Sequence, residues 1–111
     1  MSPSTRSQAS NEVRRHGAAI GSILALAGAR DVYLFGSMAR GDADASSDVD
    51  LLLGDVSHAS PVKLAEARLA LEQLLARKVD LVVLESLPAH IRQSALDERI
   101  ALTTGSDEDL S

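Results

Sequence analysis

The sequence predicts an α/β fold in which helices flank a small mixed β-sheet. Three apolar runs have strand character because they are rich in β-branched or aromatic residues: DVYLF at 31–35, DVDLLL at 48–53 and VDLVVL at 79–84. The second run is apolar enough for a central strand. Longer segments with helical spacing precede the first run, separate the second from the third and follow the third. The resulting order of helix, strand, strand, helix, strand and helix is that of an α/β sandwich.

The first helix is expected between a cap at Ser10 or Asn11 and an end at Gly28. Residues 14–29 in this region join basic residues to an apolar stretch and a small-residue end, which is also the pattern of a secretory signal. The apolar stretch begins late and contains two glycines, so a helix is favoured. We therefore expect a cytoplasmic protein.

The second and third helices have start signals of their own. Ser60 is a good N-cap, and Pro61 suits the first helical position because its missing N–H is not needed there. This helix should continue to about Arg77, whose charge suits the negative helix end. The last helix begins near Pro88, and residues 100–102 then form an edge strand or pack on the sheet.

Length and composition indicate one globular domain. We expect a flexible N-terminus at 1–9, the folded domain at 10–102 and an acidic flexible tail at 103–111. The sequence has no cysteine, which excludes disulfides and thiolate metal sites, and no stretch approaches the ~20 apolar residues of a membrane span. A formal charge of −5 and only two aromatic residues argue against direct nucleic-acid binding.

Carboxylates stand unusually close to the predicted core. Asp48 and Asp50 lie two apart in a predicted strand, so they share one face while Val49 points to the other. Such a pair repels unless a proton or a cation neutralises it. Asp80 occupies a similar position in the third strand. If the two strands are neighbours, three carboxylates meet at one end of the sheet, where such hard oxygen ligands suit Mg²⁺.

A polar loop precedes these carboxylates. Gly36 and Ser37 follow the first strand directly, and they suit a phosphate because glycine lets the backbone approach and serine offers a hydroxyl and an N–H. Gly-Ser alone is usually only a turn, and a lone Asp-x-Asp is equally weak. Gly-Ser followed after ten residues by Asp-x-Asp is far more specific. The combination predicts a metal-dependent phosphate site.

The segment GSMARGDADASSDVD, residues 36–50, resembles the signature of the nucleotidyltransferase superfamily that includes DNA polymerase beta and kanamycin nucleotidyltransferase. It is most similar to the minimal nucleotidyltransferases that act as antitoxins to HEPN-domain ribonuclease toxins. The similarity extends over residues 13–102, where RKVDLV at 77–82 and the helix after Pro88 also fit the family pattern. The resemblance implies a polymerase beta-like catalytic core.

The resemblance also implies roles for individual residues. Gly36 and Ser37 would bind the β- and γ-phosphates of a nucleoside triphosphate, usually ATP. Asp48 and Asp50 would hold two magnesium ions. Asp80 would complete the ion on the acceptor side and help to deprotonate the attacking hydroxyl.

Arg40 lies within the same segment and is placed to neutralise a phosphate. The alternative is a surface arginine that pairs with Asp42 or Asp44, both of which we expect to be solvated loop residues. Asp44 is also suited to capping a turn.

The activity that the resemblance implies is transfer of AMP from ATP to a tyrosine hydroxyl of a cognate HEPN toxin, which silences the toxin. A chain of 111 residues has little room for an acceptor domain, so a macromolecular acceptor is expected. Self-modification is disfavoured because the only tyrosine, Tyr33, lies in a predicted buried strand. Two alternatives stay open: an antitoxin that masks its partner without catalysis, and nucleotide transfer to a small molecule or an RNA end.

Overall fold

The computed structural model describes residues 8–44 and 46–102 and confirms the α/β fold. Four strands within these residues form one mixed sheet in the spatial order β3-β2-β1-β4. The strands are β1 (Arg30–Phe35), β2 (Val49–Asp55), β3 (Val79–Val83) and β4 (Ile100–Ala101). The helices are α1 (Gln8–Arg15), α2 (Gly17–Leu26), α3 (Ser37–Arg40), α4 (Pro61–Leu75) and α5 (Ala89–Glu98), with a short 3-10 turn at Leu84–Ser86.

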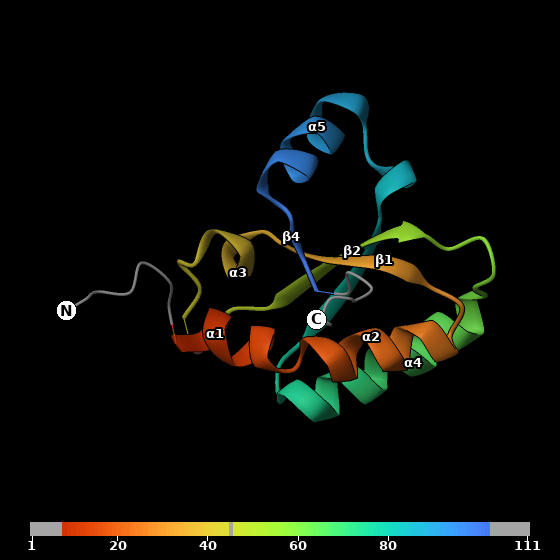
Figure 1. The fold of residues 1–111 in the computed structure, drawn as a ribbon, viewed down its shortest axis with the longest axis horizontal. Helices are drawn as coiled ribbons and strands as arrows, with labels where there is room; N and C mark the ends of the chain where they lie inside the picture. The colour runs from red at the N-terminus through yellow and green to blue at the C-terminus, as the bar shows by residue number, and fades with distance from the viewer. Residues whose placement is uncertain (1–7, 45, 103–111) are drawn as a thin grey trace, which may run out of the picture.

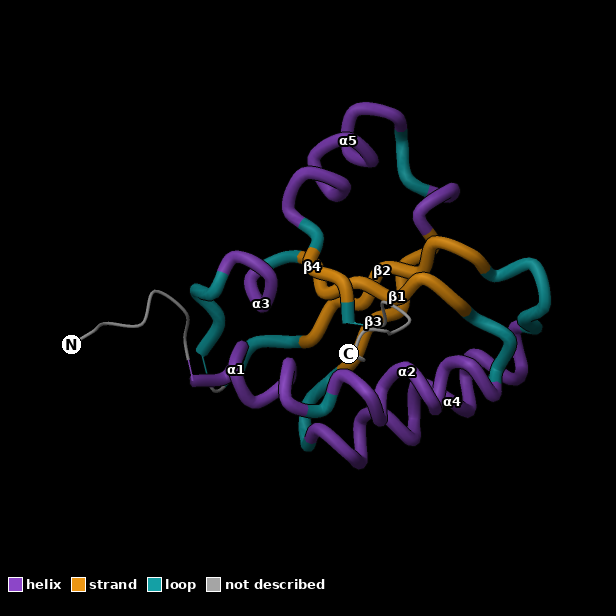
Figure 2. The backbone as a smooth tube through the Cα atoms, in the orientation of Figure 1, coloured by secondary structure: helices purple, strands orange, loops and turns teal. Residues whose placement is uncertain are grey.

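Helices lie on both faces of the sheet. In Figure 1, α1, α2 and α4 lie along one face and α5 stands over the other. Figure 2 shows the same arrangement, with the orange strands between the two groups of helices. The largest fully buried side chains include Ile20, Leu24, Leu34, Leu51 and Leu71. The main core therefore lies between the sheet and the layer of α1, α2 and α4.

The strand directions follow from the connections between strands. β1 and β2 run antiparallel and pair Phe35 with Asp50, and β4 pairs antiparallel with the other side of β1. β2 and β3 run parallel and pair Asp50 with Asp80, because α4 carries the chain back along the sheet between them. Of the two expectations for residues 100–102, the edge strand is the one observed.

The single N-terminal helix that the sequence predicts is in fact two helices. The break lies at His16, whose φ of −91° and ψ of 12° depart from helical values. Gly17 follows, and glycine weakens a continuous helix. A Cβ at Gly17 would lie 3.4 Å from the Leu102 carbonyl oxygen, so this glycine also lets the segment after β4 approach. Ser10, expected as a cap, is buried inside α1.

Gly28 ends α2, as predicted. Its φ is +90°, and the N–H groups of Gly28 and Ala29 donate to the carbonyl oxygens of Ala25 and Leu24 at 3.0 and 2.9 Å. This pair of hydrogen bonds is the Schellman arrangement of a helix end. A Cβ at Gly28 would lie 2.1 Å from the carbonyl oxygen of His58, so no larger residue fits against the loop after β2.

The start of α4 also follows the prediction. The Ser60 hydroxyl accepts a hydrogen bond from the Lys63 N–H at 3.2 Å, and Pro61 is the first helical residue. The helix ends at Leu75 rather than near Arg77, because Ala76 takes a left-handed φ of 54°. The short segment that follows leads directly into β3.

The expected acidic tail and most of the expected flexible N-terminus lie outside the described residues. Gln8 and Ala9 already belong to α1, so the helical part begins slightly before residue 10. Within the described ranges, no helix has the length and apolar character needed to cross a membrane.

Candidate active site

Three strand ends meet at one edge of the sheet. β1 ends at Phe35, while β2 and β3 begin at Val49 and Val79, and the register sets Phe35, Asp50 and Asp80 in one row across the strands. Paired positions of neighbouring strands point to the same face. Val49 is buried in the main core, so Asp50 and Asp80 belong to the opposite face, the side on which α5 lies. The structure thus brings together two of the three predicted carboxylates through strand pairing.

Gly36 lies against the carboxylate of Asp50. It follows β1 directly and takes φ 74° and ψ −148°, a conformation that residues with a Cβ rarely adopt. A Cβ at Gly36 would lie 2.8 Å from the Oδ2 atom of Asp50. The positive φ of this turn favours glycine, and a Cβ here would displace the Asp50 carboxylate.

After Gly36 the chain forms one short helical turn, α3, where the sequence predicts a plain loop. Ser37 is the first residue of α3, and its carbonyl oxygen accepts hydrogen bonds from the N–H groups of Gly41 and Asp42 at 2.9 and 3.1 Å. Gly41 ends the turn with φ 87°. These hydrogen bonds hold Gly36 and Ser37 beside the paired residues Asp50 and Asp80.

The carboxylates at this edge interact with one another. Partial burial raises the pKa of Asp50 above its ordinary value, and the negative charges of Asp80 and Asp48 and a hydrogen bond with Asp80 raise this pKa further. Asp48 lies just before β2 and is exposed, whereas Asp50 and Asp80 are half-buried. A cation among these groups would relieve the same repulsion that protonation of Asp50 relieves.

The donor set suits a hard divalent cation. All three groups offer carboxylate oxygens, which are the ligands that Mg²⁺ prefers. Among the described residues, no three carboxylate or imidazole side chains already converge on one point as metal ligands. Asp50 and Asp80 are paired across the strands, and the charge of Asp80 adds to partial burial in raising the Asp50 pKa. The chemistry and charge of the site therefore fit a cation.

Arg40, predicted to bind a phosphate, pairs with acidic side chains. Its Nε lies 3.2 Å from the Oδ2 atom of Asp42, and its Nη1 lies 3.5 Å from the Oε1 atom of Glu98 on α5. The Arg40 side chain is 49% exposed, and exposed ion pairs of this kind contribute little to stability. The surface arginine paired with Asp42, the alternative expectation, is what the structure contains. The guanidinium nevertheless remains open to an anion from solvent.

Asp44 caps the turn that leads toward β2, as predicted. Its Oδ1 atom accepts hydrogen bonds from the N–H and the hydroxyl of Ser46, both at 2.9 Å, and from the hydroxyl of Ser47 at 3.2 Å. The hydrogen bonds from Ser46 and then Ser47 lower the pKa of Asp44. Asp44 is therefore a structural residue of the loop.

Two residues that support the site were missed by sequence reasoning. Arg77, expected only as a favourable charge at the end of α4, donates from Nη1 to the carbonyl oxygens of Asp44 and Ser47, both at 3.1 Å. Glu72 accepts a hydrogen bond from the Val79 N–H at 3.0 Å and so anchors the start of β3. Arg77 thus stabilises the loop that leads to Asp48 and Asp50, and Glu72 stabilises the start of the strand that carries Asp80.

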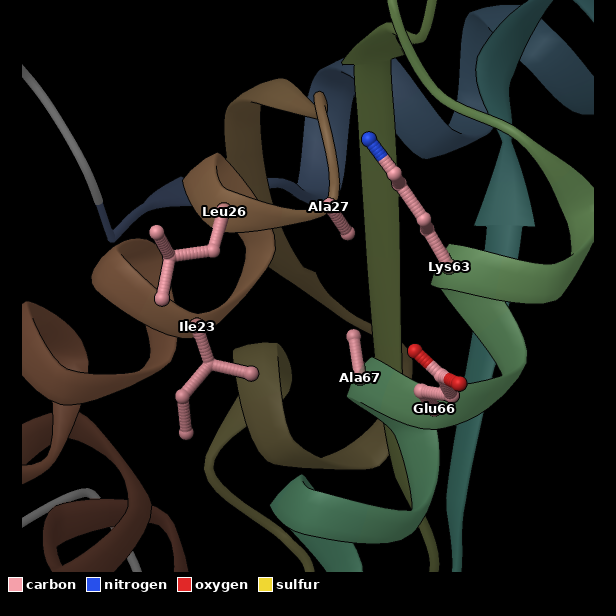
Figure 3. Close-up of a pocket in the computed structure, with 6 residues that line it drawn as sticks. All are labelled: Ile23, Leu26, Ala27, Lys63, Glu66 and Ala67. Atoms are coloured by element: carbon pink, nitrogen blue, oxygen red, sulfur yellow. The ribbon is translucent and has the colours of Figure 1, made fainter.

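A separate hollow lies on the other side of the sheet. It has a volume of about 260 Å³ and lies between α2 and α4, lined by Ile23, Leu26, Ala27, Lys63, Glu66 and Ala67 (Figure 3). Both helices cover the face opposite to Asp50 and Asp80. This hollow is therefore distinct from the carboxylate site.

Tyr33 is partly exposed, which corrects the expectation of a buried side chain. It pairs with Leu52 and so points to the same face as Asp50. The guanidinium carbon of Arg99 lies 4.9 Å from the centroid of its ring, within cation–π distance. Burial therefore no longer argues against modification of Tyr33.

Comparison with known proteins settles the family. Residues 20–102 match the family model described as a nucleotidyltransferase domain. The chain belongs to this family. The nucleotidyltransferase that the signature at residues 36–50 predicts is confirmed, as is its fold.

The proteins similar to this nucleotidyltransferase include a protein adenylyltransferase and a chain of a toxin–antitoxin structure. It is 41% identical over 71 residues to the protein adenylyltransferase MntA of Thermococcus cleftensis, a match that covers 64% of this chain and 72% of MntA. A solved structure assigned as a minimal nucleotidyltransferase is 37% identical, with a TM-score of 0.73, and 82% of this chain and 93% of that chain are covered. A toxin–antitoxin structure with AMP-PNP contains a chain that is 25% identical, with a TM-score of 0.65 and coverage of 89% and 77%.

Proposed function

We propose that this nucleotidyltransferase transfers AMP from ATP, with Mg²⁺, to a tyrosine hydroxyl of a HEPN-domain ribonuclease toxin and thereby neutralises the toxin. The observation that carries the proposal is the pairing of Asp50 with Asp80 beside the backbone of Gly36. The 41% identity to the protein adenylyltransferase MntA supports the protein acceptor. The likeness to a toxin–antitoxin structure with AMP-PNP supports the partner and the nucleotide. We place this reaction in the cytoplasm.

Three carboxylates would hold the metal. Asp48 and Asp50 would bind two magnesium ions, and Asp80 would complete the ion on the acceptor side. The raised pKa of Asp50 supports this assignment, because it reflects negative charge that a cation would neutralise. When bound, magnesium would neutralise the triphosphate and stabilise the charge that develops during phosphoryl transfer.

The other residues would bind and orient the nucleotide. Gly36 and Ser37 stand at the end of β1 beside Asp50, where the serine hydroxyl can donate to the β- or γ-phosphate. Arg40 would bind a phosphate with its positive charge, and it would give up its exposed ion pairs with Asp42 and Glu98 to do so.

The transfer itself needs a base and a leaving group. The oxygen of the acceptor hydroxyl forms a bond to the α-phosphorus of ATP, and the bond from that phosphorus to pyrophosphate breaks. Asp80 would help to remove the hydroxyl proton, the role that the family resemblance implies for this carboxylate. The products are the AMP-modified protein and pyrophosphate.

Intact mass measurement tests the proposal directly. The purified protein is incubated with ATP, Mg²⁺ and the HEPN protein encoded beside it, with Asp50→Asn as the control. Mass increments of whole adenylyl units on the HEPN protein, absent with Asp50→Asn, are the expected result. No mass increment, together with equally stable complexes of the HEPN protein with wild type and with Asp50→Asn, would indicate an antitoxin that only masks its partner. Nucleotide transfer to added RNA or to a small molecule instead would contradict the protein acceptor.

A further inference from the structure

Arg77 is a largely covered charge at the point where the loop before β2 meets the start of β3. Its side chain is only 10% exposed, although arginine is mostly found at protein surfaces. Its Nη1 donates to the carbonyl oxygens of Asp44 and Ser47, both at 3.1 Å, and its Nη2 lies 3.9 Å from the Oε1 atom of Glu12 on α1. A charge this well covered depends on its hydrogen bonds. The two carbonyls are thus held by a residue with little freedom to move.

These carbonyls belong to the loop that delivers Asp48 to the site. The side chain of Asp44 accepts hydrogen bonds from Ser46 and Ser47, its own neighbours along the chain. Those hydrogen bonds stabilise the turn internally. They do not fix the position of the turn relative to the sheet, which depends on other contacts. Asp48 stands just outside β2, so its position depends on this loop as well as on the Val49–Val79 pair that begins directly after it.

The segment that contains Arg77 attaches the loop to the sheet. Arg77 binds the loop carbonyls through its side chain, and the adjacent Lys78 accepts a hydrogen bond from the Val49 N–H at 2.9 Å through its main chain. Arg77 and Lys78 thus form hydrogen bonds with the residues directly before and after Asp48. The same segment continues into β3 and places Asp80.

We propose that Arg77 is a positioning residue that holds Asp48 where it can share a metal ion with Asp50. This inference rests on the proposed function, in which both carboxylates hold magnesium. Loss of a group that orients a metal ligand commonly weakens metal affinity about 10–100-fold. Lysine does not replace arginine here, because its single ammonium cannot hold both carbonyls, as Nη1 does, and also face Glu12, as Nη2 does.

Three variants of the full chain test this role. Arg77→Met removes the hydrogen-bond donors and keeps most of the volume, while Arg77→Lys keeps the charge. Arg92→Met is the matched control, because Arg92 also donates to two carbonyl oxygens, those of Glu85 at 3.3 Å and Leu87 at 3.1 Å. The Arg92 contacts hold a different loop, so this control reports the cost of losing such an arginine away from Asp48.

Metal affinity is measured without turnover, from the EPR signal of free Mn²⁺ in the presence of AMP-PNP. We expect Arg77→Met to weaken Mn²⁺ binding about 10-fold or more and Arg77→Lys to weaken it almost as much. Arg92→Met should lower the melting temperature yet keep the Mn²⁺ affinity within about twofold of wild type. Equal Mn²⁺ affinity in wild type and Arg77→Met would overturn the proposal. If Arg77→Met does not fold, Arg77→Lys carries the same test.

Amide hydrogen exchange at residues 46–49 separates this proposal from the proposed function. Faster exchange there in the Arg77 variants, together with weaker Mn²⁺ binding, supports the positioning role. Faster exchange with unchanged Mn²⁺ affinity leaves Arg77 as a purely structural residue and overturns it. If wild type itself binds no Mn²⁺, the proposed function fails and the positioning role fails with it, while exchange still shows whether the loop depends on Arg77.

A cavity beside Arg77 allows chemical rescue. It has a volume of about 290 Å³ and lies between α1 and the end of α4, with Glu12, His16, Leu75 and Arg77 among its lining residues. Guanidinium, the head group of arginine, is small enough to enter this space in Arg77→Ala. Millimolar guanidinium should restore Mn²⁺ affinity in Arg77→Ala, while urea and equal ionic strength of NaCl should not. If NaCl alone restored the Mn²⁺ affinity of Arg77→Ala, the effect of guanidinium would not come from local contacts with the loop carbonyls.

Discussion

Asp50 and Asp80 occupy paired positions on two parallel strands, and partial burial followed by the charge of Asp80 raises the pKa of Asp50. The register that builds the sheet therefore also brings two like charges together. In the absence of a cation, this pair opposes folding whenever both groups are ionised. The same repulsion favours any divalent cation that can bind between them.

The first prediction concerns stability without metal. Asp50→Asn should raise the free energy of unfolding of the metal-free protein at neutral pH by about 0.5–1 kcal/mol, because it removes a close like-charge contact. For a domain of this size that is a rise in Tm of about 2–8 °C. The same variant should lose the increase in Tm that Mg²⁺ gives the wild type. Thermal unfolding by circular dichroism, with EDTA or with Mg²⁺, measures both effects.

Asp55→Asn is the matched control for this prediction, because Asp55 lies in the same strand and has the opposite environment. Its carboxylate accepts hydrogen bonds from the N–H of Ser57 at 3.0 Å and from the hydroxyl at 2.7 Å, and these bonds lower its pKa. Asp55→Asn should therefore lower Tm with or without Mg²⁺. Destabilisation by both substitutions in EDTA would contradict the repulsion assigned to Asp50.

The second prediction concerns pH. Because the pKa of Asp50 is raised in the folded state, its favourable contribution is fully present below the ordinary value of 3.8 and is lost as pH rises through the folded pKa. The stability advantage of Asp50→Asn over wild type should thus be small at the acid end and grow as pH rises. Urea unfolding of both proteins in EDTA, at several pH values from about 4 to 7, measures the difference. An advantage that is constant with pH would show that charge is not its cause.

The third prediction concerns Gly36. Gly36→Ala should lower the free energy of unfolding by about 1–3 kcal/mol, because alanine is strained at this φ and its Cβ would meet Asp50. It should also remove Mg²⁺-dependent stabilisation, since Asp50 must move. Gly21→Ala, in the middle of α2, is the control and should be neutral or stabilising by up to about 1 kcal/mol. Chemical unfolding with and without Mg²⁺ is the measurement, and unchanged Mg²⁺ stabilisation in Gly36→Ala would count against the site.

The fourth prediction concerns Arg40. Arg40→Gln should raise the KM for ATP about 3–10-fold, the size expected when one charge-assisted hydrogen bond to a phosphate is lost. Glu98→Gln removes a competing carboxylate 3.5 Å from Arg40 and should leave this KM unchanged or lower it. Steady-state release of pyrophosphate measures both. If Arg40→Gln leaves the KM for ATP at the wild-type value, Arg40 is only the surface residue that its contact with Asp42 indicates.

Features with local signals in the sequence were predicted well. Ser60 and Pro61 fix the start of α4 through one side-chain hydrogen bond and one fixed φ, and Gly28 ends α2 through its own backbone freedom. The alternation of Asp48 and Asp50 with apolar residues correctly placed Asp50 on the face of the sheet opposite to Val49, whereas Asp48 lies just outside the strand. Strand pairing was needed for the rest, because the sequence does not state which strand lies beside β2.

Features that depend on distant contacts were missed. The break at His16 accompanies packing of Gly17 against Leu102, which is far away along the chain. Arg77 binds main-chain carbonyls, and every residue has a carbonyl, so no partner residue marks the interaction. Its neighbour Lys78 is exposed, although both residues have the same charge and a similar position before β3.

The parallel pairing of β2 with β3 has a consequence for the order of folding. β1 and β2 are joined by a shorter connection through α3, whereas β3 reaches β2 only after α4 has returned the chain along the sheet. Contacts between residues distant in sequence form late, because a long loop must close before they stabilise the chain. During synthesis, Gly36 and Asp50 therefore leave the ribosome before the strand that carries Asp80. A nascent chain would form the turn at Gly36 first and bring Asp80 to the carboxylate pair last.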